Sequence, residues 1–435
     1  MLVIKEVRID VMDPVLDAHD KGYPHNAPPR ACSMVGAAGW NVLAGDLPLP
    51  LALIKQGALE HNIAWMQDFV RAHGIDLAPH GKTTMSPQLF ARQLAAGAWG
   101  MTFATVTQLA VGVAAGVHRA LIANQVLQAD DLAGIAELCA RHADLRVIFL
   151  VDSLAQLALI ETWSRTHPGA PAFEVMMEIG VAGARTGCRT EAQALALARA
   201  MRASAAVTLV GIECYEGQGV TGDDRHDADY VAALLDRVQA IAQTCLTEGL
   251  FEAHELLFSA GGSALFDLVA KRLRPTLNRP VRGLLRSGCY VTHDHGHYAE
   301  LMRAVNRRIG CATEAGLRPA IEVWAAVQSC PEPHLALLTA GRRDISYDQD
   351  MPIPIARAAL GERAARPVPR SWRVSELNDQ HAYLRWDAAD DALAPVVGER
   401  VGLGISHPCT TFDKWRWMPI VDNDYRVVDA ITMHF

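Results

Sequence analysis

Between about residues 48 and 290 the chain alternates short apolar runs with longer amphipathic stretches. The runs are β-branched or bounded by turn residues, which is typical of strands, and the stretches between them have the length of helices. A run "LALIK" and a helical stretch over residues 57–73 come first. Eight strand candidates then follow in order: "IDLAPH", "WGMTFATV", "RALIANQV", "LRVIFLVD", "FEVMMEIG", "VTLVGIECY", "LLFSAGG" and "RGLLRSGCY".

Eight strand–helix alternations indicate a parallel sheet. Closed into a ring, they would form a (β/α)8 TIM-type barrel of about 250 residues, which matches the length of this region. An open doubly wound sheet is the alternative, and the count of eight favours the barrel. We therefore predict an α/β fold with a barrel over residues 46–300.

The pattern changes after residue 310, where short strand-like segments such as "PAIEVWAAVQSC", "HLALLTA" and "ERVGLGIS" are separated by turn residues. Helical periodicity is weak there, so we predict a β-rich second domain over residues 301–435. Residues 1–45 contain a strand-like "MLVIKEVRIDV" and a loop-like "KGYPHNAPPRAC", and we expect them to pack with the β-domain.

Composition narrows the class of protein. A net charge of -8 argues against a nucleic-acid surface. The nine cysteines are odd in number and contain no CxxC pair, which argues against a disulfide framework and for a reducing compartment. The charged first residues do not resemble a signal peptide, and no apolar run is long enough to span a membrane. These features predict a soluble, cytoplasmic protein that binds neither nucleic acid nor membranes.

Candidate chemistry lies where the predicted strands end, because a (β/α)8 barrel carries its active site at the carboxyl ends of its strands. Lys82 follows the first of the eight strands, and small residues follow the last two, in "SAGGSA" and "RSGCY". Loops after strands seven and eight often bind phosphate. A lysine beside a phosphate site suggests pyridoxal phosphate, which forms a Schiff base with a lysine amine. The alternative is an ordinary loop lysine and two glycine turns.

Two further strand ends carry candidate residues. Arg185, in "EIGVAGARTGCR", could bind the cofactor or a substrate carboxylate, or could form a salt bridge on the barrel rim. Tyr215 and Gly217, in "CYEGQG", follow the sixth strand. The tyrosine could stack on a ring or donate a hydrogen bond to it, although most such residues are packing groups.

Two segments are candidate metal sites. In "HDHGHY", His293, His295 and His297 would share one face of a strand, or they belong to a polar loop. In "SHPCTTFDKW", His407 and Cys409 would also point the same way on a strand. An imidazole with a soft thiolate suits zinc, and two protein ligands leave the open positions that a catalytic metal needs.

Together these motifs resemble the fold-type III pyridoxal-phosphate enzymes, in the branch that contains D-serine dehydratase and D-threonine aldolase. The resemblance extends from about residue 45 to residue 435. "PHGKT" is similar to the lysine motif of that branch, "EIGVAGARTGCR" to its glycine-and-arginine loop, and "HPC" to its metal motif. It implies that Lys82 is catalytic and that the metal ligands are His407 and Cys409. The cofactor-binding residues that it implies are Lys82, Arg185, Tyr215, Gly261, Gly262, Ser263, Gly288, Cys289 and Tyr290.

The resemblance also implies a function. Dehydratases of this branch tend to carry His-x-Cys where aldolases carry His-x-Asp, so Cys409 favours a zinc-dependent dehydratase. The expected reaction eliminates water from a D-β-hydroxy amino acid, D-serine first, giving pyruvate and ammonia. Alternatives are a D-threonine or 3-hydroxy-D-aspartate aldolase or dehydratase, an amino-acid racemase, and a non-catalytic pyridoxal-phosphate-binding protein. Members of this branch are commonly homodimers.

The sequence departs from its relatives beside the lysine motif. They often carry an arginine before Pro-His and a histidine two residues after the lysine, where this chain has Ala78 and Thr84. Both positions could contact substrate or cofactor, and we expect this protein to differ from its relatives there.

Overall fold

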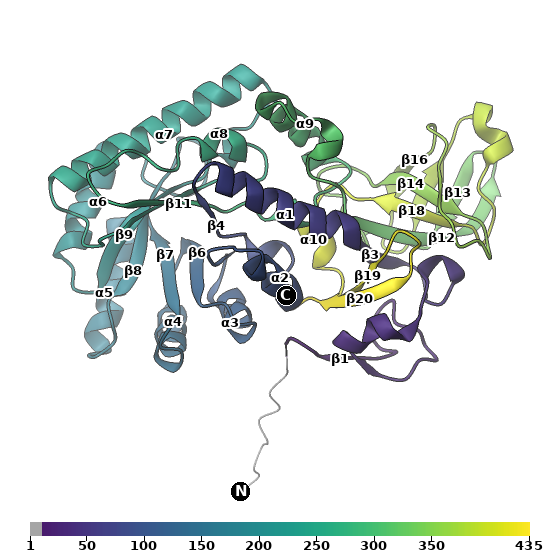
Figure 1. Ribbon diagram of the computed structural model, residues 1–435, viewed down its shortest axis with the longest axis horizontal. Helices are drawn as coiled ribbons and strands as arrows, with labels where there is room; N and C mark the ends of the chain where they lie inside the picture. The colour runs from purple at the N-terminus through teal and green to yellow at the C-terminus, as the bar shows by residue number, and fades with distance from the viewer. Residues whose placement is uncertain (1–10) are drawn as a thin grey trace, which may run out of the picture.

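The main feature of the structure, a computed structural model that describes residues 11–435, is a barrel of eight parallel strands (Figure 1). The barrel is closed by a parallel bridge between His80 and Thr102 and by a hydrogen bond of 2.7 Å from the Trp99 N–H to the Leu77 carbonyl. This confirms the predicted barrel over the open sheet. Its strands are β4 (Asp76–Leu77), β5 (Met101–Phe103), β6 (Arg119–Gln125), β7 (Arg146–Val151), β8 (Phe173–Ile179), β9 (Val207–Cys214), β10 (Leu256–Ala260) and β11 (Val281–Leu285).

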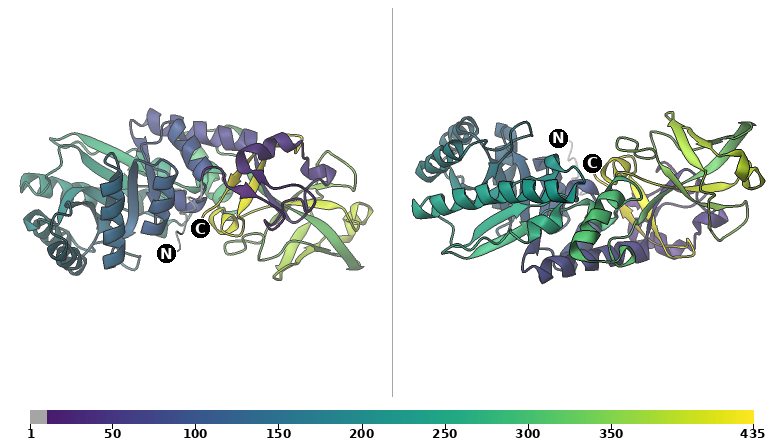
Figure 2. Two further views of the ribbon diagram at one scale, coloured as in Figure 1. Left: turned by 90° about the horizontal axis from the view of Figure 1, so that it is seen from below. Right: turned by 90° about the horizontal axis from the view of Figure 1, so that it is seen from above.

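Helices surround the barrel, as Figure 2 shows from two sides. Several begin at a Ser or Thr whose hydroxyl accepts an N–H of the first helical turn, as at Ser86, Thr105, Ser153 and Thr190. Each of these four caps fixes the residue at which its helix begins. The helices are α1 (Gln56–Ala72), α2 (Pro87–Ala95), α3 (Val106–Ala114), α4 (Ala129–Arg141), α5 (Leu154–Thr166), α6 (Glu191–Ala203), α7 (Asp224–Thr247), α8 (Phe266–Ala270) and α9 (His297–Ile309).

The second sheet is mainly antiparallel and forms the β-rich domain predicted near the C-terminus. The first predicted strand, "LALIK", is β3 (Leu51–Lys55), which pairs with β12 and β19 of this sheet rather than with the barrel. The other strands are β12 (Ile321–Glu332), β13 (Leu335–Leu338), β14 (Ile353–Ala358), β15 (Arg366–Pro367), β16 (Arg373–Leu377), β17 (Ala382–Arg385), β18 (Arg400–Gly404), β19 (Trp417–Val421) and β20 (Val427–Thr432).

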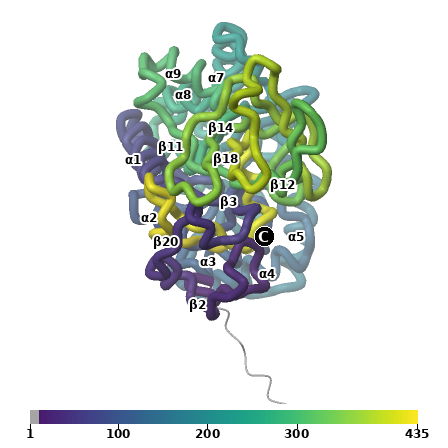
Figure 3. The backbone as a smooth tube through the Cα atoms, turned by 90° about the vertical axis from the view of Figure 1, so that its right-hand side faces the viewer, coloured from purple at the N-terminus to yellow at the C-terminus, as the bar shows by residue number. Residues whose placement is uncertain are grey.

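The N-terminal segment packs on the β-domain, next to β20 (Figure 3). It contains β1 (Val15–Leu16), β2 (Arg30–Ala31) and a short 3-10 helix, η1 (Cys32–Ala38). Asn41 bridges Arg426, and the Asn41 side chain donates a hydrogen bond to the Asp424 carbonyl. The strand-like segment at residues 1–11 lies almost entirely outside the described residues. The domain limits 45/46 and 300/301 remain predictions.

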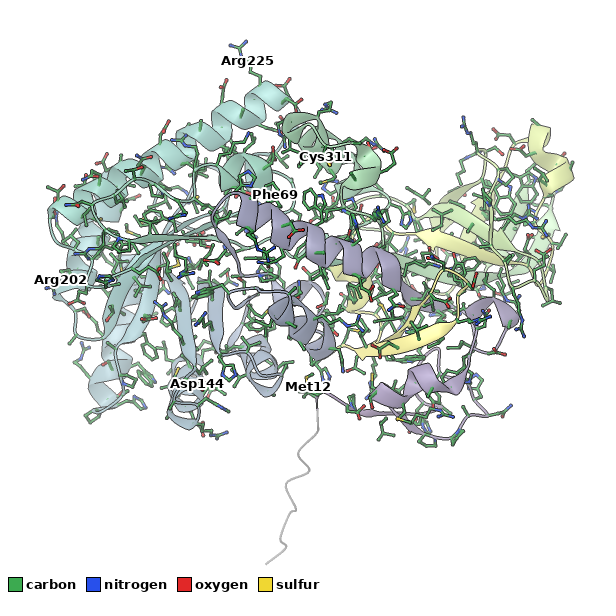
Figure 4. All side chains as sticks on the ribbon, viewed as in Figure 1. Met12, Phe69, Asp144, Arg202, Arg225 and Cys311 are labelled. Atoms are coloured by element: carbon green, nitrogen blue, oxygen red, sulfur yellow. The ribbon has the colours of Figure 1, made fainter. Side chains whose placement is uncertain are left out.

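A continuous apolar core joins barrel, helices and β-domain. Phe69 of α1, labelled in Figure 4, packs its ring edge-on against Phe266 of α8, with ring centroids 5.0 Å apart. Across residues 11–435, no helix combines the length and apolarity needed to cross a membrane.

Candidate active site

One cavity at the carboxyl ends of the barrel strands is lined by all of the predicted cofactor and metal residues except Tyr290. Its volume is about 240 Å³, roughly eight times the share of one liquid water, so it has room for an organic ligand. Both domains contribute to the wall. The predicted residues on it are Lys82, Arg185, Tyr215, Gly261, Gly262, Ser263, Gly288, Cys289, His407 and Cys409.

Lys82 lies in a 3-10 turn, η3 (Gly81–Thr83), directly after the residues that close the barrel. The turn is held tightly, because a side chain at Gly81 would come within 2.8 Å of the Phe103 ring. A side chain at Gly288 would come within 2.5 Å of the Thr83 hydroxyl. The loop after β11 can therefore approach the lysine turn this closely only with glycine at position 288.

His80 precedes this turn and also lines the cavity. The residue is partly buried, and its buried Nδ1 atom has no hydrogen-bond partner among the described residues. Burial lowers the pKa of His80 well below its ordinary value, and the charges of Lys82, Arg286 and Arg185 lower it further. His80 is therefore a neutral imidazole that can accept or donate one hydrogen bond to a ligand.

The glycine loop after β10 is held from behind by Glu216. The two carboxylate oxygens of this buried residue accept the N–H groups of Gly261 at 3.0 Å and of Gly262 at 2.6 Å. Gly261 has a φ of 102°, which favours glycine. Because these two N–H groups are engaged by Glu216, a phosphate group at this loop would depend on Ser263 and on the loop after β11.

A buried ion pair crosses the bottom of the cavity between Arg286, at the end of β11, and Glu213, in β9. Arg286 also donates to the Cys214 carbonyl at 3.2 Å. Burial raises the pKa of Glu213 to about 8, and the Arg286 charge limits the rise. Arg286 Nε and Glu213 Oε2 have no hydrogen-bond partner among the described residues. Together with His80 Nδ1, they are three buried polar atoms on residues of the cavity lining that could bind a polar ligand.

Arg185 and Tyr215 face each other on the same wall, with the guanidinium carbon 4.5 Å from the centre of the tyrosine ring. This is a cation–π contact. Burial raises the pKa of the Tyr215 hydroxyl, and the Glu216 charge adds to the rise. Tyr215 therefore offers a neutral hydroxyl and a ring face.

The His-Pro-Cys segment does not lie on a strand, contrary to the prediction: it follows β18 in a loop that leads into α10, and it reaches the cavity from the β-domain. The Cys409 sulfur, at the start of α10 (Cys409–Phe412), lies 3.6 Å from the Cys289 sulfur and 3.5 Å from the Thr83 hydroxyl oxygen. The hydrogen bond from Cys289, and then His407, lower the pKa of Cys409, whereas the same thiol contact and burial raise that of Cys289. Cys409 therefore has thiolate character, the form that binds metals.

His407 completes this segment. Its Nδ1 atom lies 2.5 Å from Asp348 Oδ2. Burial lowers the pKa of His407, but Cys409 and Asp348 outweigh it and raise the pKa to about 9. Within the part of the chain that the structure describes, no three His, Cys, Asp or Glu side chains are placed to hold a metal ion together. His407 and Cys409 thus offer two protein donors, one nitrogen and one sulfur.

The histidines of "HDHGHY" do not share a strand face. His293 has a φ of 48° in a turn, and His297 is the first residue of α9. Burial lowers the pKa of His293 and of His295 to about 4, so both are neutral. Over residues 11–435 they belong to no group of three His, Cys, Asp or Glu side chains that could hold a metal ion.

Three other predicted positions do not reach the cavity. The Tyr290 hydroxyl accepts a hydrogen bond of 2.8 Å from the Gln93 side chain, in a buried position beside the site. Ala78 packs inside the barrel, and Thr84 is buried. The threonine on the cavity wall is Thr83.

Several residues that form the site were not predicted from the sequence. His80, Glu213, Arg286 and Tyr298 line the cavity, and Glu216 and Asp348 lie behind it. Arg286 lies in "RSGCY" and Glu216 in "CYEGQG", so their positions in these two motifs could have identified them as site residues. Asp348 lies between β13 and β14, where no motif marks it.

Fold and site define a class of protein: the chain belongs to the family described as "Alanine racemase, N-terminal domain", which matches residues 54–290. A second description, "Putative serine dehydratase domain", matches residues 320–421. These matches confirm the resemblance to fold-type III pyridoxal-phosphate enzymes of the D-serine dehydratase and D-threonine aldolase branch.

Individual proteins of known activity are similar to this chain in sequence or in fold. The D-threo-3-hydroxyaspartate dehydratase of Delftia sp. (strain HT23) is 32% identical over 384 residues, covering 84% of this chain and 92% of the relative. The D-threonine aldolase of Arthrobacter sp. is 27% identical over 364 residues, covering 84% and 86%. The crystal structure of D-threonine aldolase from Filomicrobium marinum shares the fold, with a TM-score of 0.74 at 24% identity and coverage of 89% and 95%.

Proposed function

We propose that this protein is a pyridoxal-phosphate- and metal-dependent dehydratase that eliminates water from a D-β-hydroxy amino acid, with D-serine as the first substrate to test. The observation that carries the proposal is the meeting of two motifs in one cavity. The lysine turn and the His-Pro-Cys segment touch through Thr83 and Cys409, 3.5 Å apart. The named activities of the dehydratase and aldolase relatives, both on D-β-hydroxy amino acids, support the substrate class.

The residues of the cavity fit the cofactor. Lys82 supplies the amine that would hold its aldehyde carbon, and Ser263 and Gly288 supply a small-residue surface for the phosphate. Tyr215 offers a ring face, and the unpartnered Arg286 Nε and His80 Nδ1 offer polar contacts. When bound, pyridoxal phosphate withdraws electrons from the bond between Cα and its hydrogen.

The donor set at the other wall fits a zinc ion. His407 and Cys409 would hold it through one nitrogen and one sulfur, which leaves positions open for substrate. The metal would supply a Lewis acid for the β-hydroxyl group, a poor leaving group on its own.

Two residues of the chain have separate roles in this reaction. Lys82 is the base that removes the α-proton, because it lines the same cavity as the other cofactor residues and its amine can accept a proton there. Arg185 lies on the same wall and would orient the substrate carboxylate. The products from D-serine would be pyruvate and ammonia, and the protein would act as a homodimer.

The decisive experiment measures ammonia, 2-oxo acid and glycine after incubation with D-serine, D-threonine and 3-hydroxy-D-aspartate, with L-serine as the control. Ammonia with a 2-oxo acid supports the proposal. Glycine with an aldehyde would identify an aldolase instead, and conversion of D- to L-serine a racemase. Bound cofactor without any turnover would indicate a binding protein.

A second measurement tests the two assigned groups. Borohydride should fix the cofactor covalently on the wild type and on Lys271→Ala, but not on Lys82→Ala. Chelation of the metal should abolish ammonia release, and added zinc should restore it. Full activity in the chelated, metal-free enzyme would refute the role given to His407 and Cys409.

A further inference from the structure

We infer that Asp348 is a positioning residue that fixes the imidazole of His407 for metal binding. This inference rests on the proposed function, because His407 is assigned to the metal there. Asp348 Oδ2 lies 2.5 Å from His407 Nδ1, and the second ring nitrogen is thereby left for a ligand in the cavity that His407 lines. A metal-binding histidine commonly donates its other ring N–H to a carboxylate, which sets its tautomer and orientation.

The carboxylate is itself held in place by the segment that it orients. Its second oxygen, Oδ1, accepts a hydrogen bond of 2.6 Å from the Thr410 hydroxyl. Both oxygens of Asp348 therefore bind side chains on either side of Cys409. A rotation of the His407 ring away from this position would break its hydrogen bond to Asp348, whose other oxygen is engaged by Thr410.

The surrounding loop gives Asp348 a rigid base, through paired hydrogen bonds between residues 346–350 and residues 406–411. The Ser346 N–H donates to the Thr411 hydroxyl at 3.1 Å, and the His407 N–H donates to the Ser346 hydroxyl at 3.3 Å. The Asp350 N–H donates to Ser406 at 3.2 Å, and the Ser406 hydroxyl donates back to the Asp350 carbonyl at 2.8 Å.

These contacts separate two roles within one loop. Ser346 and Asp350 hold the loop against the His-Pro-Cys segment, and Asp350 does so through its main chain. Asp348 makes its contacts with its carboxylate and reaches the imidazole itself. A change at Asp348 should therefore alter the metal site while the loop stays attached, and a change of the Asp350 side chain should alter neither.

The test uses the full-length, cofactor-loaded protein after removal of its metal, with zinc titrated against a chromophoric chelator. We expect Asp348→Ala to weaken zinc binding by about 10- to 100-fold, and Asp348→Asn, which retains one acceptor oxygen, to weaken it less. Asp350→Asn is the matched control and should bind zinc as the wild type does. Cobalt(II) is a second probe, since its visible spectrum reports on the ligands and should change in Asp348→Ala only.

Four outcomes are decisive. Weaker zinc binding in both Asp348 variants and a changed cobalt spectrum in Asp348→Ala, with cofactor absorbance and melting temperature unchanged, support the inference. Wild-type zinc affinity in Asp348→Ala overturns it and leaves the proposed function intact. Equal weakening in Asp350→Asn also overturns it, because the effect would then belong to the loop as a whole. A wild-type protein that binds no zinc overturns the metal assignment itself, and the inference with it.

Discussion

Glu216 offers a quantitative test of how the glycine loop is held. Glu216→Gln keeps the size of the side chain but replaces one acceptor oxygen with an NH2 group. One of the two N–H groups of Gly261 and Gly262, at 3.0 and 2.6 Å in the wild type, would then face a donor. A hydrogen bond to a charged group contributes about 1.5–3 kcal/mol, and a buried N–H left without a partner costs a similar amount. We expect the free energy of unfolding to fall by about 2–3 kcal/mol.

The same change should weaken the cofactor site. The loop also carries Ser263. If even part of this destabilisation moves the loop, the affinity for pyridoxal phosphate should fall. Each 1.4 kcal/mol corresponds to a tenfold change, and we expect a loss of roughly tenfold or more.

Urea unfolding of the cofactor-free chain and absorbance titration with pyridoxal phosphate measure the two effects. Glu376→Gln, an exposed substitution on β16, is the control and should change neither. If the free energy of unfolding of Glu216→Gln is within about 0.5 kcal/mol of the wild-type value and the variant binds the cofactor equally well, Glu216 does not hold the loop. Substitutions of exposed residues usually have effects of that size.

Two more outcomes follow from the geometry and the charges of the site. Gly261→Ala should lower the free energy of unfolding by about 2–4 kcal/mol, because φ is 102° at this position and the added methyl group would lie 2.2 Å from the Leu285 side chain. Gly222→Ala, where φ is 83° and the surrounding space is open, should lower it by only about 1 kcal/mol. Equal losses in urea unfolding would contradict this. His407, whose pKa is raised to about 9, should stabilise the metal-free protein fully below the ordinary histidine value of about 6.5 and lose that contribution as the pH rises through 9. The stability difference between the wild type and His407→Gln should therefore shrink between pH 6.5 and 10, and a constant difference would argue against the stabilisation of the His407 imidazolium by Cys409 and Asp348.

The barrel could be predicted from the sequence because its strands are buried on both faces. Each reads as a mainly apolar run, and eight such runs separated by helices leave few arrangements. The partner of "LALIK" could not be predicted in this way. Its apolar run fits either sheet, and the choice is made by pairing with strands more than 250 positions later, such as Ile54 with Ile321.

The site was predictable where a motif places a residue at a strand end, as for Lys82 or Cys409. It was not predictable within turns, where neighbouring side chains point in different directions. Cys289 and Tyr290 are adjacent in a 3-10 turn, η5 (Cys289–Val291), and only Cys289 faces the cavity. Asp348 reaches His407 from a loop 59 positions earlier, a contact that depends on how the β-domain folds rather than on local pattern.

The cavity is closed by residues from distant parts of the chain, and this sets an order of events during synthesis. Thr83 and Cys409 are 326 positions apart. At the roughly 5–20 residues per second of a ribosome, Cys409 is made on the order of 16 to 65 s after the lysine turn. β12, one partner of β3, is made late in that interval, and β19, the other partner, is made only after Cys409. A nascent or truncated chain could therefore complete its barrel strands and still present an unfinished active site.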